Sequence, residues 1–164
     1  MIDKKKLLLH VCNIAIRAGQ NILTFYNNEI EVTSKNDSSP LTKADLSSNK
    51  LILNGLNNLD KSIPILSEES LIDWNIRKHW KKYWLVDPLD GTKEFIKKND
   101  EFTVNIALIK NNIPILGVIY VPAKSILYFS QKKLGSFKLI TKLEINNLDK
   151  IKKIFISKKY KKVR

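Results

Sequence analysis

The chain has little of what would place it outside the cell or within a membrane. It contains one cysteine, Cys12, among 164 residues, and a single cysteine cannot form an internal disulfide, which is typical of the reducing cytoplasm. No apolar run is long enough to cross a bilayer, and no internal repeat or low-complexity linker is present. A hydrophobic content of 43% indicates a globular protein. We therefore expect a single α+β domain over residues 1–164, located in the cytoplasm.

Acidic residues are missing from the segment 150–164, which contains seven lysines and one arginine and so supplies +8 of the net charge of +13. A basic tail of this kind could attract nucleic acid or an anionic membrane surface. It holds no recognised nucleic-acid motif, however. We expect a solvated tail with no specific nucleic-acid partner and, at most, weak peripheral contact with the inner face of the cell membrane.

The most informative segment is 87–92, which reads Asp-Pro-Leu-Asp-Gly-Thr and directly follows the apolar run 83–86. The run predicts a short buried strand, and proline with glycine predicts a sharp turn at its end. Asp87 and Asp90 place two carboxylates three positions apart, and Thr92 adds a hydroxyl. Such a cluster suits Mg²⁺ and similar oxygen-seeking cations. The commoner alternative is an ordinary turn rich in Asp, Pro and Gly.

A second acidic element makes the ordinary turn less probable as an explanation. The strand-like run 63–67 is followed by Glu68 and Glu69. Two strands that each end in carboxylates can present them at one rim of a sheet, where ligand sites of α/β proteins tend to form. Because adjacent side chains point in different directions, we expect only one of the two glutamates to face a shared metal.

The third element is Thr42 followed three residues later by Asp45, a pattern that predicts a capping box at the start of a helix. Taken alone, capping is the favoured explanation by roughly a few to one. The two acidic motifs are what make Asp45 a site candidate. The helix continues through its apolar positions, which are Ala44, Leu51, Leu53, Leu56 and Leu59.

The remaining pattern predicts helices packed on a largely antiparallel sheet, an α+β fold. An amphipathic N-terminal helix, with Asp3 as a plausible cap, is predicted by apolar residues at helical spacing, which are Leu8, Val11, Ala15, Ala18, Ile22 and Phe25. The runs 103–109 and 115–121 predict a hairpin connected by 110–114, and 126–130 predicts a third antiparallel strand. Weaker strand signals lie at 137–140 and 154–156.

These motifs together resemble those of a known family. The chain is similar to the lithium-sensitive, magnesium-dependent phosphomonoesterases of the inositol monophosphatase superfamily, whose acidic pair followed by D-P-[LI]-D-G-T is met at 67–70 and 87–92. Within that superfamily it is most similar to the bacterial 3'(2'),5'-bisphosphate nucleotidases of sulfate assimilation. The segments that carry this similarity are 37–42, 66–69, 83–86, 93–96 and 101–109. The resemblance runs from about residue 2 to about residue 160. It implies the N-terminal half of a layered αβαβα fold, with two long helices packed on the sheet.

The resemblance also implies a two-metal phosphatase that converts adenosine 3',5'-bisphosphate to AMP and phosphate. By motif position, Glu68, Asp87 and the backbone carbonyl of Leu89 would hold the first Mg²⁺. Asp87 would bridge to a second Mg²⁺, with Asp90 as a further ligand.

The catalytic groups follow from the same motif positions. Thr92, polarised by Asp45, would orient the attacking water, and backbone N–H groups near Gly91 and Thr92 would receive phosphate oxygens. The implied catalytic residues are Thr92, Asp45 and Glu68. The implied substrate-binding residues are Glu68, Leu89, Asp90, Gly91 and Thr92.

One departure from the family pattern limits this expectation. The family has a further aspartate in a W-D-x-A motif well downstream, which completes the second metal site. Here all three tryptophans precede residue 87, and after Phe102 the acids are Glu144 and Asp149. We therefore expect half of a two-metal site, weak Mg²⁺ binding, and a rate lower by roughly three orders of magnitude or more.

Three alternatives stay open. One is a sugar phosphatase of the inositol monophosphatase type, which the segment 93–96 disfavours. Another is a non-catalytic remnant, or one half of a split enzyme that a complementing C-terminal chain completes. The last is a non-catalytic binding protein that acts through its basic tail.

Overall fold

The computed structural model describes residues 4–28, 32–34, 40–141 and 161–163. Its sheet contains β3 (Ile65–Ser67), β4 (Lys82–Asp90), β5 (Thr103–Lys110), β6 (Ile113–Val121), β7 (Ile126–Gln131), β8 (Gly135–Ile140) and β9 (Lys161–Val163), in that spatial order. The helices are α1 (Lys4–Tyr26), α2 (Lys43–Leu59), α3 (Trp74–Arg77) and α4 (Thr92–Ile96). The strands β1 (Val32–Ser34) and β2 (Pro40–Thr42) form a separate antiparallel pair.

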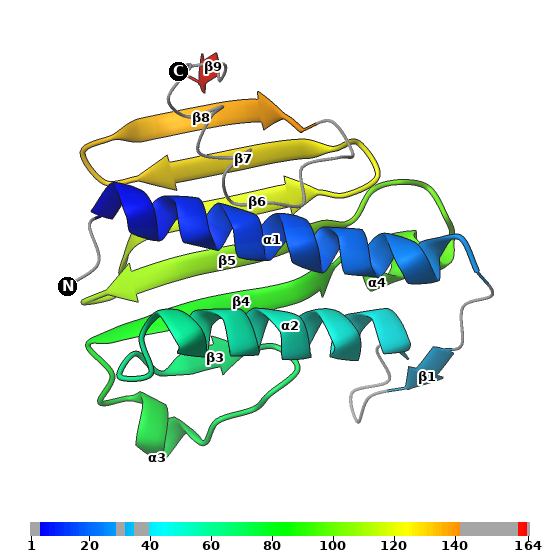
Figure 1. The fold of residues 1–164 in the computed structure, drawn as a ribbon. Helices are drawn as coiled ribbons and strands as arrows, with labels where there is room; N and C mark the ends of the chain where they lie inside the picture. The colour runs from blue at the N-terminus through cyan, green and yellow to red at the C-terminus, as the bar shows by residue number, and fades with distance from the viewer. Residues whose placement is uncertain (1–3, 29–31, 35–39, 142–160, 164) are drawn as a thin grey trace.

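The predicted α+β class is confirmed. Neighbouring strands of the seven-stranded sheet run antiparallel, except that β3 and β4 are parallel. The two long helices, α1 and α2, lie side by side across one face of the sheet (Figure 1). Within the described ranges, no helix combines the length and the apolar character needed to cross a bilayer.

The predicted hairpin is confirmed with a shorter connection. Only Asn111 and Asn112 separate β5 from β6, and both have positive φ angles, of 50° and 60°. Two left-handed residues match the twist of the strands, and asparagine tolerates that conformation well. Pro114 lies inside β6, beside a register shift at Leu108 and Ile109, where an irregular ladder accommodates its missing N–H.

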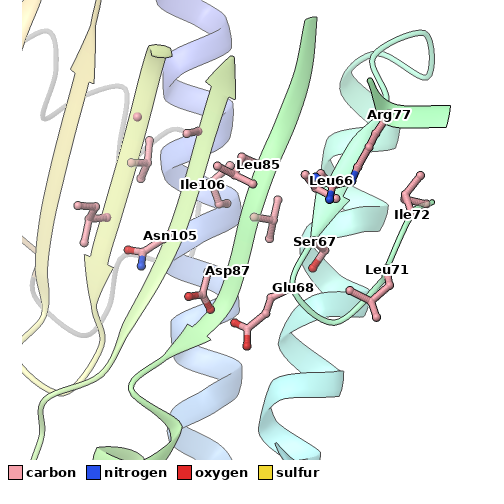
Figure 2. Close-up of a pocket in the computed structure, with 15 residues that line it drawn as sticks. Leu66, Ser67, Glu68, Leu71, Ile72, Arg77, Leu85, Asp87, Asn105 and Ile106 are labelled. Atoms are coloured by element: carbon pink, nitrogen blue, oxygen red, sulfur yellow. The ribbon is translucent and has the colours of Figure 1, made fainter. Parts of the chain in front are cut away.

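The face of the sheet opposite α1 and α2 stays open among the described elements. Side chains that alternate onto it are exposed: Leu85 on β4 by 43%, Ile119 on β6 by 46% and Ile140 on β8 by 70%. Figure 2 shows Leu85 on this face. An antiparallel sheet with one solvated face usually places polar residues there. The apolar side chains on this face therefore form an exposed hydrophobic surface of the kind found at interaction sites.

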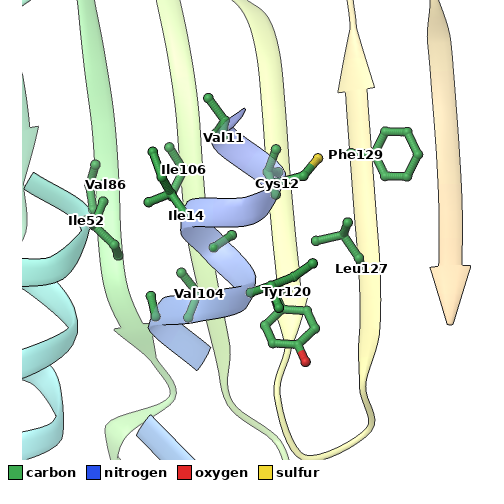
Figure 3. Packing of buried hydrophobic residues seen from close by; sticks show 14 of the residues in the cluster. Val11, Cys12, Ile14, Ile52, Val86, Val104, Ile106, Tyr120, Leu127 and Phe129 are labelled. Atoms are coloured by element: carbon green, nitrogen blue, oxygen red, sulfur yellow. The ribbon is translucent and has the colours of Figure 1, made fainter. Parts of the chain in front are cut away.

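The hydrophobic core lies between the helices and the covered face of the sheet. Val11, Cys12 and Ile14 of α1 meet side chains such as Val104 and Tyr120 from the strands (Figure 3). Cys12 is fully buried, and burial raises the pKa of its thiol. Because the thiolate is the reactive form, Cys12 is a packing residue and not a nucleophile.

The structure describes only residues 161–163 of the basic segment, so the prediction of a solvated tail is not tested. Residues 161–163 form β9, which pairs antiparallel with β8 through Ser136 and Val163 at one end. Pairing with a distant strand leaves no local signal in a run of lysines, so the sequence did not predict this strand. The weaker strand signal at 154–156 lies outside the described residues.

Candidate metal centre and phosphate-binding turn

The segment 87–90 is part of a strand, and the prediction of a sharp turn directly after Val86 was wrong. β4 continues to Asp90, with Asp87 opposite Asn105 and Asp90 opposite Thr103. Two residues of β4 therefore face one residue of β5, which is a bulge. Because a bulge leaves a residue out of the ladder, Pro88 fits there without losing a hydrogen bond.

The chain reverses one residue later, at Gly91. Gly91 has a φ of 89° and directly precedes α4. A Cβ atom at this position would lie 2.7 Å from the carbonyl oxygen of Glu101. The left-handed backbone and this close approach both require glycine.

The two acidic motifs meet at one rim of the sheet, as the sequence predicted. Ser67 pairs with Val86 in the parallel ladder of β3 and β4, and the Glu68 N–H donates to the Val86 carbonyl at 3.1 Å. Glu68 and Asp87 therefore follow paired residues, and Figure 2 shows their carboxylates pointing toward one another.

Asp87 is held in an environment that opposes its negative charge. Burial is the main cause, and repulsion from Glu68 and Asp90 adds to it, so the pKa of Asp87 rises from 3.8 to about 7. Among the described residues, its buried Oδ1 atom has no hydrogen-bond partner. A divalent cation would remove the repulsion and supply a partner for that oxygen.

The donor set fits a Mg²⁺ ion more closely than a metal with an all-protein cage. Across the described parts of the chain, no group of three or more His, Cys, Asp or Glu side chains converges on one point. Mg²⁺ is usually bound by one or two carboxylates, with waters and substrate phosphates completing its shell. Glu68 and Asp87 provide such a pair of oxygen donors.

Metal binding to the purified chain should weaken as the pH falls below about 7. A proton and a metal ion compete for the Asp87 carboxylate, so the protonated form must release its proton first. We expect the Kd for Mn²⁺ to rise about tenfold between pH 8 and pH 6. Calorimetric titration in two buffers of different ionisation enthalpy would measure the Kd and the released proton together. A Kd that is constant from pH 8 to pH 6 would contradict the interpretation of Asp87 as a metal ligand.

Asp45 serves both as a helix cap and as a contact to the acidic turn. Its Oδ2 atom accepts from the N–H of Thr42 at 2.8 Å and from its hydroxyl at 2.5 Å, which confirms the capping box. Its Oδ1 atom accepts from the Thr92 hydroxyl at 3.1 Å. Thr92 Oγ1 also lies 3.3 Å from the Leu89 carbonyl oxygen. The fully buried Asp45 therefore fixes the threonine that ends the motif.

Asn105 is a site neighbour that the sequence motifs did not identify. Its Nδ2 donates to Asp90 Oδ2 at 3.1 Å, and its Oδ1 accepts from the Thr103 hydroxyl at 3.1 Å. The alternation of β5 could have placed Asn105 on the open face, but the register that sets it opposite Asp87 is not visible in the sequence.

A cavity of about 610 Å³ opens beside the carboxylate pair on the open face of the sheet. Glu68 and Asp87 lie at its edge, and Arg77 contributes a basic side chain (Figure 2). Most of the lining is apolar, including Leu66, Leu71, Ile72, Leu85 and Ile119. The segment after Ser70, which supplies Leu71, Ile72 and Arg77, was not singled out from the sequence.

Known proteins are similar to this chain in sequence and in fold. A family model described as the inositol monophosphatase family matches residues 3–163. The chain is 52% identical over 124 residues to the 3'(2'),5'-bisphosphate nucleotidase CysQ of Escherichia coli O6:H1, covering 74% of this chain and 50% of that protein. It is 46% identical over 145 residues to the protein of the same name from Buchnera aphidicola, covering 83% of this chain and 55% of that protein.

A solved structure agrees with the sequence comparison. CysQ from Bacteroides thetaiotaomicron matches with a TM-score of 0.80 and 38% identity, over 98% of this chain and 58% of that chain. SuhB from Bartonella henselae matches with a TM-score of 0.69 and 30% identity, over 76% of this chain and 48% of that chain. The chain spans about half the length of the curated relatives it matches.

Proposed function

Because the chain belongs to the inositol monophosphatase family, we propose that it forms the metal-binding half of a Mg²⁺-dependent phosphatase. The proposed reaction converts adenosine 3',5'-bisphosphate to AMP and phosphate, in keeping with the names of its relatives. The observation that carries the proposal is the pairing of Glu68 with Asp87, whose charge is disfavoured until a cation binds.

We assign the first Mg²⁺ to Glu68, Asp87 and the Leu89 carbonyl, and a second to Asp87 and Asp90. When bound, the metals supply charge stabilisation and lower the pKa of a coordinated water. The hydrogen bond from Asn105 to Asp90 supports the assignment because it fixes one carboxylate oxygen and leaves the other for a ligand.

We assign the other motif residues to orienting the attacking water and binding the phosphate group. The Thr92 hydroxyl donates a hydrogen bond to Asp45, so its oxygen lone pairs are available to accept a hydrogen bond from the attacking water. Gly91 is the N-cap of α4, which begins at Thr92, and the first backbone N–H groups of a helix have no partner within it. We assign these N–H groups to phosphate oxygens, whose negative charge they stabilise as the phosphorus is attacked.

We also propose that the open face of the sheet is covered by the second half of such an enzyme, on the same polypeptide or on a separate one. The relatives are about twice as long as the matched region. The apolar cavity beside Glu68 and the exposed Leu85 and Ile119 support this placement. A covering layer would also exclude water from the carboxylates, which strengthens their interactions with metal and phosphate.

The test is phosphate release by the purified chain, first alone and then mixed with the part of the Escherichia coli relative that lies outside the region matched by this chain. Adenosine 3',5'-bisphosphate and an inositol monophosphate would be compared with Mg²⁺, with EDTA and with added lithium. We expect release from the nucleotide to rise about a hundredfold or more on mixing, to need Mg²⁺ and to be inhibited by lithium. Preference for the inositol phosphate would favour the sugar-phosphatase alternative, and release that persists in EDTA would contradict the metal assignment.

A further inference from the structure

The buried face of α2 is polar where it approaches the acidic motifs. Asp45 and Ser48 are fully buried and Asn49 is 8% exposed, whereas Ile52 and Leu56 continue the same face as apolar residues. Positions 45, 48 and 49 lie next to one another on a helix surface. Because an unpaired polar group is costly to bury, Ser48 and Asn49 should have hydrogen-bond partners. The identity of those partners indicates the role of this face.

Asn49 holds both ends of the turn that carries Glu68. The Ser67 hydroxyl donates to Asn49 Oδ1 at 2.8 Å, and Asn49 Nδ2 donates to the Ser70 hydroxyl oxygen at 3.2 Å. Ser67 and Ser70 are themselves joined, because the Ser70 N–H donates to the Ser67 carbonyl at 3.1 Å. One side chain therefore fixes the four-residue turn in which Glu68 is the second residue.

Ser48, the preceding residue of α2, holds the other acidic segment. Its hydroxyl donates to the Pro88 carbonyl at 2.8 Å, and Pro88 is the bulge residue that directly follows Asp87. The segments that carry Glu68 and Asp87 are thus hydrogen-bonded to adjacent residues of one helix. Two sets of hydrogen bonds therefore determine the separation between Glu68 and Asp87. One is the parallel ladder of β3 and β4, and the other joins Ser48 and Asn49 of α2 to the two acidic segments.

We propose that Asn49, together with Ser48, is a positioning residue that sets the spacing of the Glu68–Asp87 pair for metal binding. This inference rests on the proposed function. Asn49 reaches the carboxylates only through Ser67 and Ser70, so it acts on their position and not on the reaction. Residues in such supporting contacts typically change metal affinity by about 10- to 100-fold when they are removed.

The experiment compares Asn49→Ala with Asn54→Ala, which makes the same change on the exposed side of the same helix. Mn²⁺ binding would be measured by electron paramagnetic resonance at a temperature where each variant is folded, and amide hydrogen exchange would be recorded without metal. Asn49→Ala should weaken Mn²⁺ binding about tenfold or more and speed exchange of the Ser70 amide. Asn54→Ala should leave both within about twofold of the original chain.

A folded Asn49→Ala variant with unchanged Mn²⁺ affinity and unchanged Ser70 exchange would overturn the inference. If that variant does not fold, Ser70→Ala replaces it, because this change removes one of the two Asn49 contacts at a half-buried position. Ser70→Ala should then weaken Mn²⁺ binding about threefold or more, and unchanged binding would overturn the inference. If the original chain binds no Mn²⁺, the proposed function fails, whereas the exchange of the Ser70 amide still decides whether Asn49 orders the turn.

Discussion

Replacing Asp87 by asparagine should lower phosphate release by the completed enzyme about a thousandfold or more. Asparagine keeps the shape of the side chain but has no negative charge and only one acceptor oxygen. It therefore cannot bridge two cations, and several kcal/mol of charge stabilisation are lost. Steady-state release of phosphate from adenosine 3',5'-bisphosphate would measure the effect.

The matched control is Glu69→Gln, which makes the same change of charge next to Glu68. Glu69 does not line the cavity at the carboxylate pair, and the sequence predicts that only one of the two glutamates faces the metal. We expect its rate to stay within about threefold of the original. An equal loss of rate in Asp87→Asn and Glu69→Gln would show that the total negative charge in this region, and not the Glu68–Asp87 pair, supports the reaction.

The same Asp87→Asn change should stabilise the metal-free fold at alkaline pH. Folding raises the pKa of Asp87 from 3.8 to about 7, so the fold disfavours the charged form. The contribution of the Asp87 carboxyl to the free energy of unfolding is therefore greatest below pH 3.8. That contribution is lost as the pH rises through about 7. Asp87 is partly solvated, so after screening we expect a gain of about 1 kcal/mol for the variant at pH 8. Urea unfolding in EDTA at pH 8 would measure it, and a less stable variant would contradict the raised pKa.

Gly91→Ala should reduce the free energy of unfolding by about 2–4 kcal/mol. An alanine at a φ of 89° is strained, and its Cβ would lie 2.7 Å from the Glu101 carbonyl oxygen and 3.3 Å from the Phe102 Cα. Because these neighbours are backbone atoms, they cannot move aside cheaply. Movement of the backbone at residue 91 would also displace Asp90 and Thr92, which flank it, so metal binding should weaken as well.

The control for this substitution is Gly117→Ala on β6. A Cβ built at Gly117 has nothing within 4 Å, and its φ lies outside the left-handed range. We expect a change of less than about 1 kcal/mol there. Similar urea denaturation midpoints for the two variants would contradict a special conformational role for Gly91.

Local signals in the sequence predicted a large part of the site. The Thr42–Asp45 capping box and the strand–carboxylate pattern at Glu68 and Asp87 depend on residues close in sequence, and the structure contains both. Asp45 caps α2 through one carboxylate oxygen and contacts Thr92 through the other, and its catalytic role stays a prediction.

The features that the sequence did not reveal depend on distant partners. The polar face of α2 is satisfied by Ser67, 18 residues from Asn49, and by Pro88, 40 residues from Ser48. The bulge in β4 depends on its register with β5, which no local pattern of Pro and Gly contains. The assignment of ligands and catalytic groups to the motif residues stays a prediction.

The Glu68–Asp87 metal site is tested most directly by Mn²⁺ binding to the purified chain at pH 8, measured by electron paramagnetic resonance for the original sequence and for Asp87→Asn. We expect weak Mn²⁺ binding to the original chain, displacement of the Mn²⁺ by Mg²⁺, and binding about tenfold or more weaker in Asp87→Asn. Mn²⁺ binding of equal strength in the two proteins would contradict the claim that Glu68 and Asp87 form a metal site.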